Sequence, residues 1–273
     1  MTRPATTPTG LAARGVTLSY LGIMVVLPLA ALAVQAAQPG TSAFLKVLAD
    51  PIARHALKLT FATAGVMVVI NAVMGTATAW VLVRCEFPGK NLVNALIDLP
   101  FAAPTVVTGL MLVVLYGPSS TLGVVMGRYG LNVIYHQPGI VLALMFVTYP
   151  FVIRSVQPVL LEMDRAEEEA AATLGASPWT TFRRVTLPTL RPAILTGAAL
   201  SFSRALGEFG SVVMVAGNRP MATKTAPMFI FGQIEGGRRH EALVVSVVLL
   251  ASSLGVLVAL NLLQRGGERS HGR

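Results

Sequence analysis

The chain has 273 residues, of which 54% are apolar and only 12% are charged, and its mean hydropathy is +0.69. This composition excludes an ordinary soluble domain and is typical of a protein that crosses a membrane several times. The net charge of +9 would suit a nucleic-acid partner. In a chain this apolar, however, we interpret it as the basic excess of cytoplasmic loops. We therefore expect contact with membrane lipids and not with nucleic acid.

The N-terminal residues 1–15 are rich in Thr, Pro and Ala and include Arg3 and Arg14. A cleaved signal peptide is one interpretation. We prefer an uncleaved first span over residues 16–37, because this apolar run is longer than a typical signal-peptide core. Pro28 within the span predicts a kink.

A second span is predicted over residues 57–83 and a third over 92–115, separated by the polar turn 84–91. Prolines and hydroxyl residues interrupt the third span, which predicts a bent helix that lines the interior of the bundle. Asp98 lies in this span. We favour a polar contact to a neighbouring span over a place in the transport pathway, because a bare carboxylate repels an anion.

Residues 116–138 are predicted to form a glycine-rich loop with a short surface helix. A fourth span is predicted over residues 140–160, broken by Pro150 and Pro158. A fifth and a sixth span follow over 193–216 and 242–263. Together the six spans form one transmembrane domain, residues 16–264, followed by a basic tail, 265–273.

Six spans place both termini on the same side of the membrane. Lys and Arg are more numerous in the termini, in the turn 84–91 and in the loop after the fourth span than in the other three loops. This bias favours a cytoplasmic location for both termini. The last external loop is also basic, which would attract an anion.

The longest strongly polar stretch is residues 164–192. Asp164 and Glu167 have the spacing of a capping box, so a helix can begin there and continue until Gly175 ends it. Ser177 followed by Pro178 predicts a second helix start.

We expect the second helix to end at the prolines, Pro188 and Pro192. A short helical hairpin of this kind, charged on one side and apolar on the other, suits docking into a groove of another protein.

Seven residues of this hairpin match the EAA loop of the membrane subunits of bacterial ATP-binding cassette (ABC) importers: Glu169, Ala170, Ala171, Gly175, Val185, Leu187 and Pro188. The stretches 98–110 and 200–218 resemble the sulfate/thiosulfate (CysT-type) permeases. The resemblance covers about residues 61–264.

The resemblance implies an all-α membrane protein of the type I ABC importer permease fold, with six transmembrane helices and a cytoplasmic coupling loop, residues 164–190. It implies a location in the bacterial inner membrane. The implied partners are a homologous sister permease, two ATP-binding cassette subunits and a periplasmic or lipid-anchored sulfate-binding protein.

Catalytic and cofactor sites are not expected in this chain. It lacks the phosphate-binding G-x-x-x-x-G-K-[ST] motif, since Gly89 and Lys90 are followed by Asn91. ATP and Mg would therefore be used by a partner ATPase. Neither a metal site nor a disulfide is expected, because the histidines lie far apart and Cys85 is the only cysteine.

The fifth span contains four polar residues at helical spacing: Ser201, Arg204, Glu208 and Ser211. This spacing predicts that they share one face of the helix. A charge at the bilayer centre costs about 2.5 to 3.5 kcal/mol, so these residues should face a cavity or one another. Two interpretations stay open: a self-satisfied Arg204–Glu208 pair, or a face that lines the translocation path and donates hydrogen bonds to an oxyanion.

Other functions remain as alternatives. A molybdate or tungstate permease would carry a near-isosteric dianion, and composition does not separate these substrates. An ion-coupled secondary transporter would need intramembrane carboxylates at corresponding positions of two repeated halves, and no such repeat is visible. A membrane enzyme would need a convergent catalytic cluster, and the sequence has none.

Overall fold

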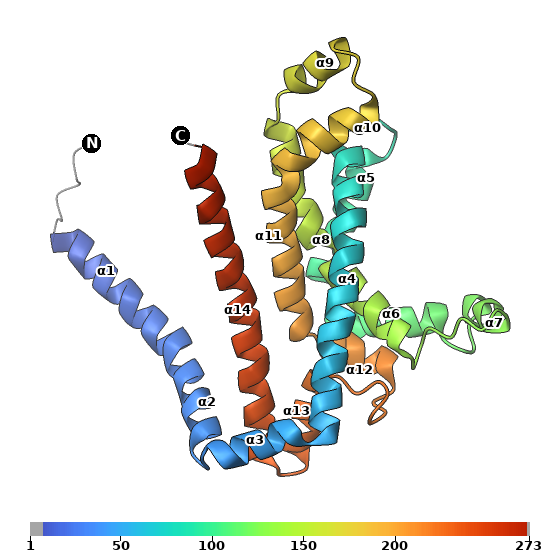
Figure 1. The fold of residues 1–273 in the computed structure, drawn as a ribbon. Helices are drawn as coiled ribbons and strands as arrows, with labels where there is room; N and C mark the ends of the chain where they lie inside the picture. Colours follow the sequence, from blue (N-terminus) through green and yellow to red (C-terminus); the bar gives the residue numbers. More distant parts are fainter. Residues whose placement is uncertain (1–7, 272–273) are drawn as a thin grey trace.

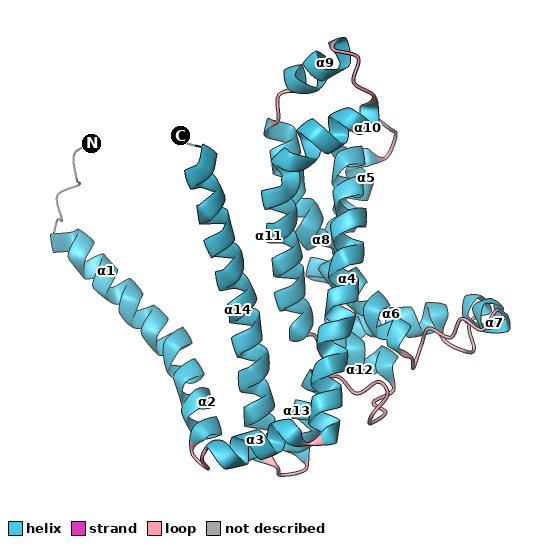
Figure 2. Cartoon of the chain, viewed as in Figure 1, coloured by secondary structure: helices cyan, strands magenta, loops and turns pink. Residues whose placement is uncertain are grey.

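The computed structural model describes residues 8–271, and all regular structure in that range is helical (Figure 2). Four helices are long and apolar enough to cross a membrane, and two bent helix pairs raise this number to six. The predicted all-α membrane class is confirmed. The predicted tails, 1–15 and 265–273, lie partly outside the described residues. Within the described range, the first helix begins at Pro8 and the last helix ends at His271.

The N-terminal segment forms α1 (Pro8–Leu21), a π-helical turn η1 (Gly22–Val26) and α2 (Leu27–Ala37). The π turn lies directly before Pro28, where the structure departs from regular α-helix. There the Leu27 N–H bonds to the Gly22 carbonyl, five residues back. Figure 1 shows α1 leaning away from α14, and the apolar window within Ala13–Ala37 has no buried residue.

A short helix, α3 (Thr41–Ala49), leads into α4 (Pro51–Arg84), which packs against α8 (Gln137–Glu162) and α11 (Leu187–Leu206). These three helices form the centre of the bundle. Glycines allow the close approach: a Cβ at Gly75 would lie 2.9 Å from the Val152 Cβ, and one at Gly197 would lie 2.7 Å from the Val152 Cα.

The expected break of the fourth span at its prolines is wrong, because α8 is one helix that includes Pro150 and Pro158. A proline removes only its own N–H from the helix. Within a span, neighbouring helices can satisfy the carbonyl that this leaves free. The predicted short helix of the 116–138 loop is α7 (Thr121–Arg128).

The third apolar segment bends sharply, as its prolines predict. It consists of α5 (Lys90–Ala102) and α6 (Thr105–Tyr116), which meet at an angle of 115°. Residues 92–115 are therefore not one straight span. Ala103, the residue before Pro104, is extended (φ −76°, ψ 133°). This conformation ends α5, because the residue before a proline avoids the helical region.

The prolines after the polar hairpin do not end its second helix, contrary to expectation. Helix is continuous from α10 (Pro178–Thr181) through the π turn η2 (Phe182–Thr186) into α11. In η2 the Leu187 N–H bonds to the Phe182 carbonyl, and this wider turn accommodates Pro188. The hairpin is thus joined rigidly to a membrane helix.

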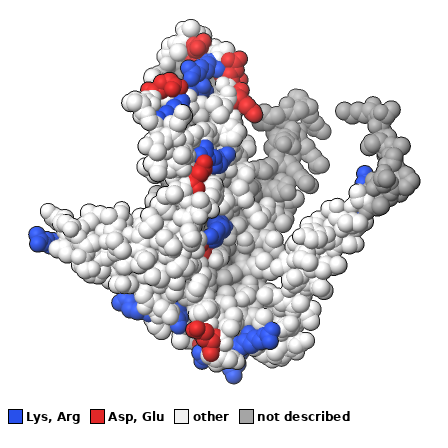
Figure 3. All heavy atoms as spheres, turned by 180° about the vertical axis from the view of Figure 1, so that it is seen from behind, with Lys and Arg blue, Asp and Glu red and all other residues white. Residues whose placement is uncertain are grey.

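The C-terminal part forms α12 (Gly210–Ala216), α13 (Ala226–Glu235) and α14 (Arg239–His271). Figure 1 places the hairpin helix α9 (Arg165–Thr173) at one end of the molecule and α3 and α13 at the other, and the end of α14 points towards the end that carries α9. Figure 3 shows charged residues gathered at these two ends, with few in the white face between them.

Candidate functional site

The first half of the hairpin begins after Asp164 and ends at Gly175, as predicted, but Asp164 caps it through Ala166 and not through the expected capping box with Glu167. The Asp164 Oδ1 accepts a hydrogen bond from the Ala166 N–H at 2.9 Å, at the start of α9. Gly175 ends the helix in the left-handed region, with φ +82°. The Ala176 N–H then bonds back to the Ala171 carbonyl at 3.0 Å. This closure fixes the direction in which the chain leaves α9.

The second half of the hairpin begins at Ser177, whose Oγ accepts from the Thr180 N–H at 3.3 Å. Phe182 lies between two tryptophans: its ring stacks on Trp179 and on Trp80 of α4, with both pairs of ring centroids 5.7 Å apart. An aromatic ladder therefore connects the hairpin to the end of α4.

The predicted coupling residues form the outer surface of the hairpin. Those that are exposed are Glu169, Ala170, Gly175 and Pro188, and those that are half-buried are Ala171, Val185 and Leu187. Two large apolar side chains extend this surface: Leu174 is 88% exposed and Trp179 is 67% exposed. Such an outward apolar patch beside a carboxylate is a surface that a second protein can cover.

Sequence reasoning did not single out Glu168, which points inward. Its Oε1 accepts from the Arg84 Nη2 at 3.1 Å and from the Thr186 Oγ at 3.0 Å. Two features of the sequence hinted at this contact: a basic residue, Arg84, directly after the second predicted span, and three consecutive glutamates at 167–169.

The polar residues of the fifth span do not share one helical face, contrary to prediction. Helix α11 ends at Leu206, and α12 continues only from Gly210 at an angle of 65°. Gly207 ends α11, and Glu208 leaves the helix to bind the first turn of α12. The Ser201 hydroxyl points to α8, where it donates to the Thr148 carbonyl at 3.3 Å.

The structure does bring Arg204, Glu208 and Ser211 together. The Arg204 Nη1 lies 2.7 Å from the Glu208 Oε2. The other carboxylate oxygen, Oε1, accepts from both the backbone N–H and the hydroxyl of Ser211, each at 2.9 Å. The Glu208 side chain is 1% exposed and that of Arg204 is 37% exposed, so the carboxylate is enclosed while the guanidinium reaches the surface.

A second arginine within the bundle is held differently. Arg154 of α8 makes a two-pronged ion pair with Asp98 of α5, at 2.8 Å to Oδ1 and 2.6 Å to Oδ2. It also donates to the Asn94 side chain and carbonyl and to Gln157. All five donors of this guanidinium are therefore used. The favoured interpretation of Asp98, a contact to a neighbouring span, is confirmed.

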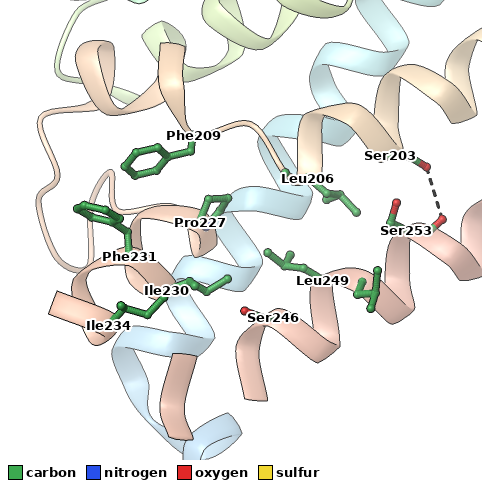
Figure 4. A pocket seen from close by; sticks show the side chains of 12 residues that line it. Ser203, Leu206, Phe209, Pro227, Ile230, Phe231, Ile234, Ser246, Leu249 and Ser253 are labelled. Carbon is green, nitrogen blue, oxygen red and sulfur yellow. Dashed lines mark hydrogen bonds between the residues drawn. The ribbon is translucent and has the colours of Figure 1, made fainter. Parts of the chain in front are cut away.

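A cavity of about 480 Å³ lies beside the break in the fifth span, between α11, α13 and α14. Figure 4 shows Phe209, Ile230, Phe231 and Leu249 around it, with few polar atoms. Because a dianion requires hydrogen-bond donors or cations, this apolar cavity does not suit an oxyanion.

Residues 71–266 match the family described as binding-protein-dependent transport system inner membrane component. The chain belongs to this family. It is 46% identical over 254 residues to the sulfate transport system permease protein CysT of Synechocystis sp., covering 93% of this chain and 89% of that protein. It is 41% identical over 256 residues to the protein of the same name from Escherichia coli, covering 93% and 92%.

Solved structures share the fold. A bacterial ABC transporter that imports the acidic polysaccharide alginate has a TM-score of 0.75 at 19% identity, covering 93% of this chain and 94% of that one. The methionine ABC transporter MetNI in an inward-facing conformation has a TM-score of 0.56 at 18% identity, covering 77% and 94%. By its family match and its relatives, the chain is a multi-pass inner membrane protein and the permease component of an ABC importer, not its ATPase.

Proposed function

We propose that this permease carries sulfate or thiosulfate into the cell. The observation that supports this most directly is the 46% identity to a sulfate transport system permease, which extends over 93% of the chain. The likeness includes both the polar hairpin and the fifth span, and so covers the surfaces that would meet ATPase and substrate.

The hairpin 164–190 is the docking element for the ATPase in this proposal. Its exposed Glu169, Leu174 and Trp179 offer one carboxylate and two apolar anchors to a partner groove. Because α10, η2 and α11 are one continuous helix, a push on the hairpin would move a membrane helix. The ATPase requires this end, and with it both termini, to be cytoplasmic.

The complete importer would contain a homologous sister permease and two ATP-binding cassette subunits, which use ATP and Mg. A periplasmic or lipid-anchored sulfate-binding protein would deliver substrate to the opposite end. A solved relative of this fold is an alginate transporter in complex with a periplasmic protein bound to alginate pentasaccharide, with a TM-score of 0.76. The exposed apolar residues of the spans would face lipid or the sister subunit.

Arg204 is the candidate contact for the anion. Its only partner among the described residues is one oxygen of Glu208, so most of its N–H donors remain available. Ser211 and Glu208 hold the pair in place, and Ser201 supports α11 against α8. A guanidinium recognises a tetrahedral oxyanion through paired charge-assisted hydrogen bonds.

The test is uptake of labelled sulfate into vesicles that contain the membrane complex and its binding protein, with and without ATP. Unlabelled thiosulfate and molybdate serve as competitors. Glu169→Ala should lose transport, whereas the neighbouring exposed Glu167→Ala should keep it. Both variants add an alanine to the same helix, so helix propensity does not separate them.

Three results would contradict parts of this function. Uptake without ATP would favour an ion-coupled secondary transporter. Uptake that only molybdate or tungstate inhibits would leave the importer intact and replace the substrate. Transport that Glu169→Ala leaves unchanged would remove the proposed docking role of the hairpin.

A further inference from the structure

Helix α9 is attached to the rest of the chain at few points. Its main packing neighbours are α10 and η2, which belong to the same hairpin. Between the hairpin and α4 lies a cavity of about 280 Å³, lined by Trp80, Glu168 and Phe182 among others. Since no tight core fills this space, apolar packing alone does not fix α9 to the membrane helices.

Glu168 connects α9 to two membrane helices at once. Arg84, which donates to it at 3.1 Å, is the last residue of α4. Thr186, which donates at 3.0 Å, is the last residue of η2 and lies directly before α11. Both donors bond to the same oxygen, Oε1, so one carboxylate joins α9, α4 and the start of α11.

The contact is shielded from water. The Arg84 side chain is 11% exposed and that of Glu168 is 23% exposed, and Thr186 is buried. The Arg84 Nε is also buried, with no hydrogen-bond partner among the described residues, so Glu168 is the carboxylate that compensates this cation. Its neighbours Glu167 and Glu169 are exposed and make no ion pair in the described part of the chain.

We infer that Glu168 is the positioning residue that transmits displacement of α9 to α4 and α11. This inference rests on the proposed function of the hairpin as the ATPase docking element. The aromatic stack of Trp80, Phe182 and Trp179 joins α4 to η2 and α10 and includes no residue of α9. The contact of Glu168 with Arg84 and Thr186 is therefore the side-chain link through which movement of α9 would reach α4 and the start of α11.

The experiment compares Glu168→Ala with Glu167→Ala in the complete importer with its binding protein. The measured quantity is labelled sulfate transported per ATP hydrolysed, with the melting temperature and the amount of co-purified ATPase determined in parallel. We expect the ratio to fall about tenfold or more for Glu168→Ala, within the range typical of coupling between sites. Glu167→Ala should retain the wild-type ratio, and both complexes should keep their ATPase subunits.

Two further variants distinguish transmission from a merely structural role. Glu168→Gln should recover part of the ratio, because its amide oxygen can still accept from Arg84 and Thr186. Arg84→Ala should lower the ratio as Glu168→Ala does. The double variant should lower it no further than the worse single variant, since both remove the same contact.

The inference is overturned if Glu168→Ala and Glu167→Ala give the same transport per ATP, or if Glu168→Ala releases the ATPase subunits, which would make it a docking contact. A wild-type complex without ATP-dependent uptake would instead contradict the proposed function itself. A ratio that falls only in proportion to the melting temperature across the variants would also overturn the inference.

Discussion

Two arginines lie within the membrane bundle, each with a carboxylate partner, and they are used in opposite ways. Arg154 binds Asp98 of another helix through both carboxylate oxygens, and Asn94 and Gln157 take its remaining donors. Arg204 contacts one oxygen of Glu208 in its own segment. In the first pair the cation is saturated. In the second it is the carboxylate that is saturated, by Ser211.

The donors that a charge pair leaves unused distinguish a structural pair from one that can bind an anion. Arg154 has none, so it holds α5 against α8 and cannot bind an anion without releasing one of its present partners. Arg204 is held at one side only and is 37% exposed, so it remains both fixed and available. Each pair has a net charge of zero, so net charge does not distinguish them.

The two pairs are also connected physically. Asp98 holds α5, which continues into α6 after the 115° bend. Helix α6 packs on α12, whose first turn is bound by Glu208. A change at either arginine can therefore reach the other through the contact between α6 and α12.

The largest expected effect on stability is that of Glu208→Ala. It removes a carboxylate that is 1% exposed, leaves the cation of Arg204 uncompensated and deprives α12 of its first-turn acceptor. Breaking a buried ion pair costs about 3 kcal/mol at the lower end of the usual range, and the partial exposure of Arg204 places it there. Thermal melting of the purified complex measures this loss.

The matched control is Glu235→Ala at the end of α13, because Glu235 is exposed and makes no ion pair within the described residues. Its melting temperature should equal that of the wild type. Equal melting temperatures for both variants would mean that Glu208 does not support the bent fifth span.

Arg154→Lys should have the next largest effect. A lysine keeps the charge but has three donors and no planar fork, so it cannot bind Asp98, Asn94 and Gln157 together. We expect a loss of about 1 to 2 kcal/mol, limited by the partial exposure of both side chains. Melting of Arg154→Lys, Asp98→Asn and the double variant tests this, since strong additivity of the two losses would contradict a shared contact.

Gly109→Ala tests the connection between the pairs. A Cβ at Gly109 would lie 2.6 Å from the Ser211 carbonyl oxygen and 2.8 Å from the Met214 Cβ, so α6 and α12 would have to separate. We expect a loss of about 1 kcal/mol or more. Gly65→Ala in α4 is the matched control, because nothing lies within 4 Å of its Cβ position and alanine favours helix. A loss as large at Gly65 would contradict this explanation.

Local signals predicted local structure well. The capped start of α9, its end at Gly175 and the second start at Ser177 depend on backbone conformation and nearest neighbours. The bend of the third span followed from Pro104. Proline was nevertheless a poor guide elsewhere: Pro150, Pro158 and Pro188 lie within continuous helix, because the neighbouring packing and a π turn accommodate them.

Contacts between distant segments could not be predicted in the same way. The spacing of Ser201, Arg204, Glu208 and Ser211 suits one helix, but α11 ends at Leu206, and the Glu208 carboxylate accepts from Ser211 in the first turn of α12. Glu168 and Arg84 are 84 positions apart, and nothing in the pattern of either segment pairs them. The sequence indicated which groups needed partners, and only the fold assigns those partners.

Arg204→Lys should have the smallest effect on stability and a clear effect on transport. A lysine can still pair with Glu208, so the buried carboxylate stays compensated and the melting temperature should remain close to that of the wild type. It lacks the fork that would bind an oxyanion through two parallel hydrogen bonds. We expect sulfate uptake to fall about tenfold, the equivalent of roughly 1.4 kcal/mol, as measured in the same vesicles.

Arg154→Lys is the matched substitution with the reverse expectation, a lower melting temperature from loss of the α5 contact. If Arg204→Lys also melts early while its uptake per folded complex is unchanged, Arg204 is a second structural pair and the substrate path lies elsewhere.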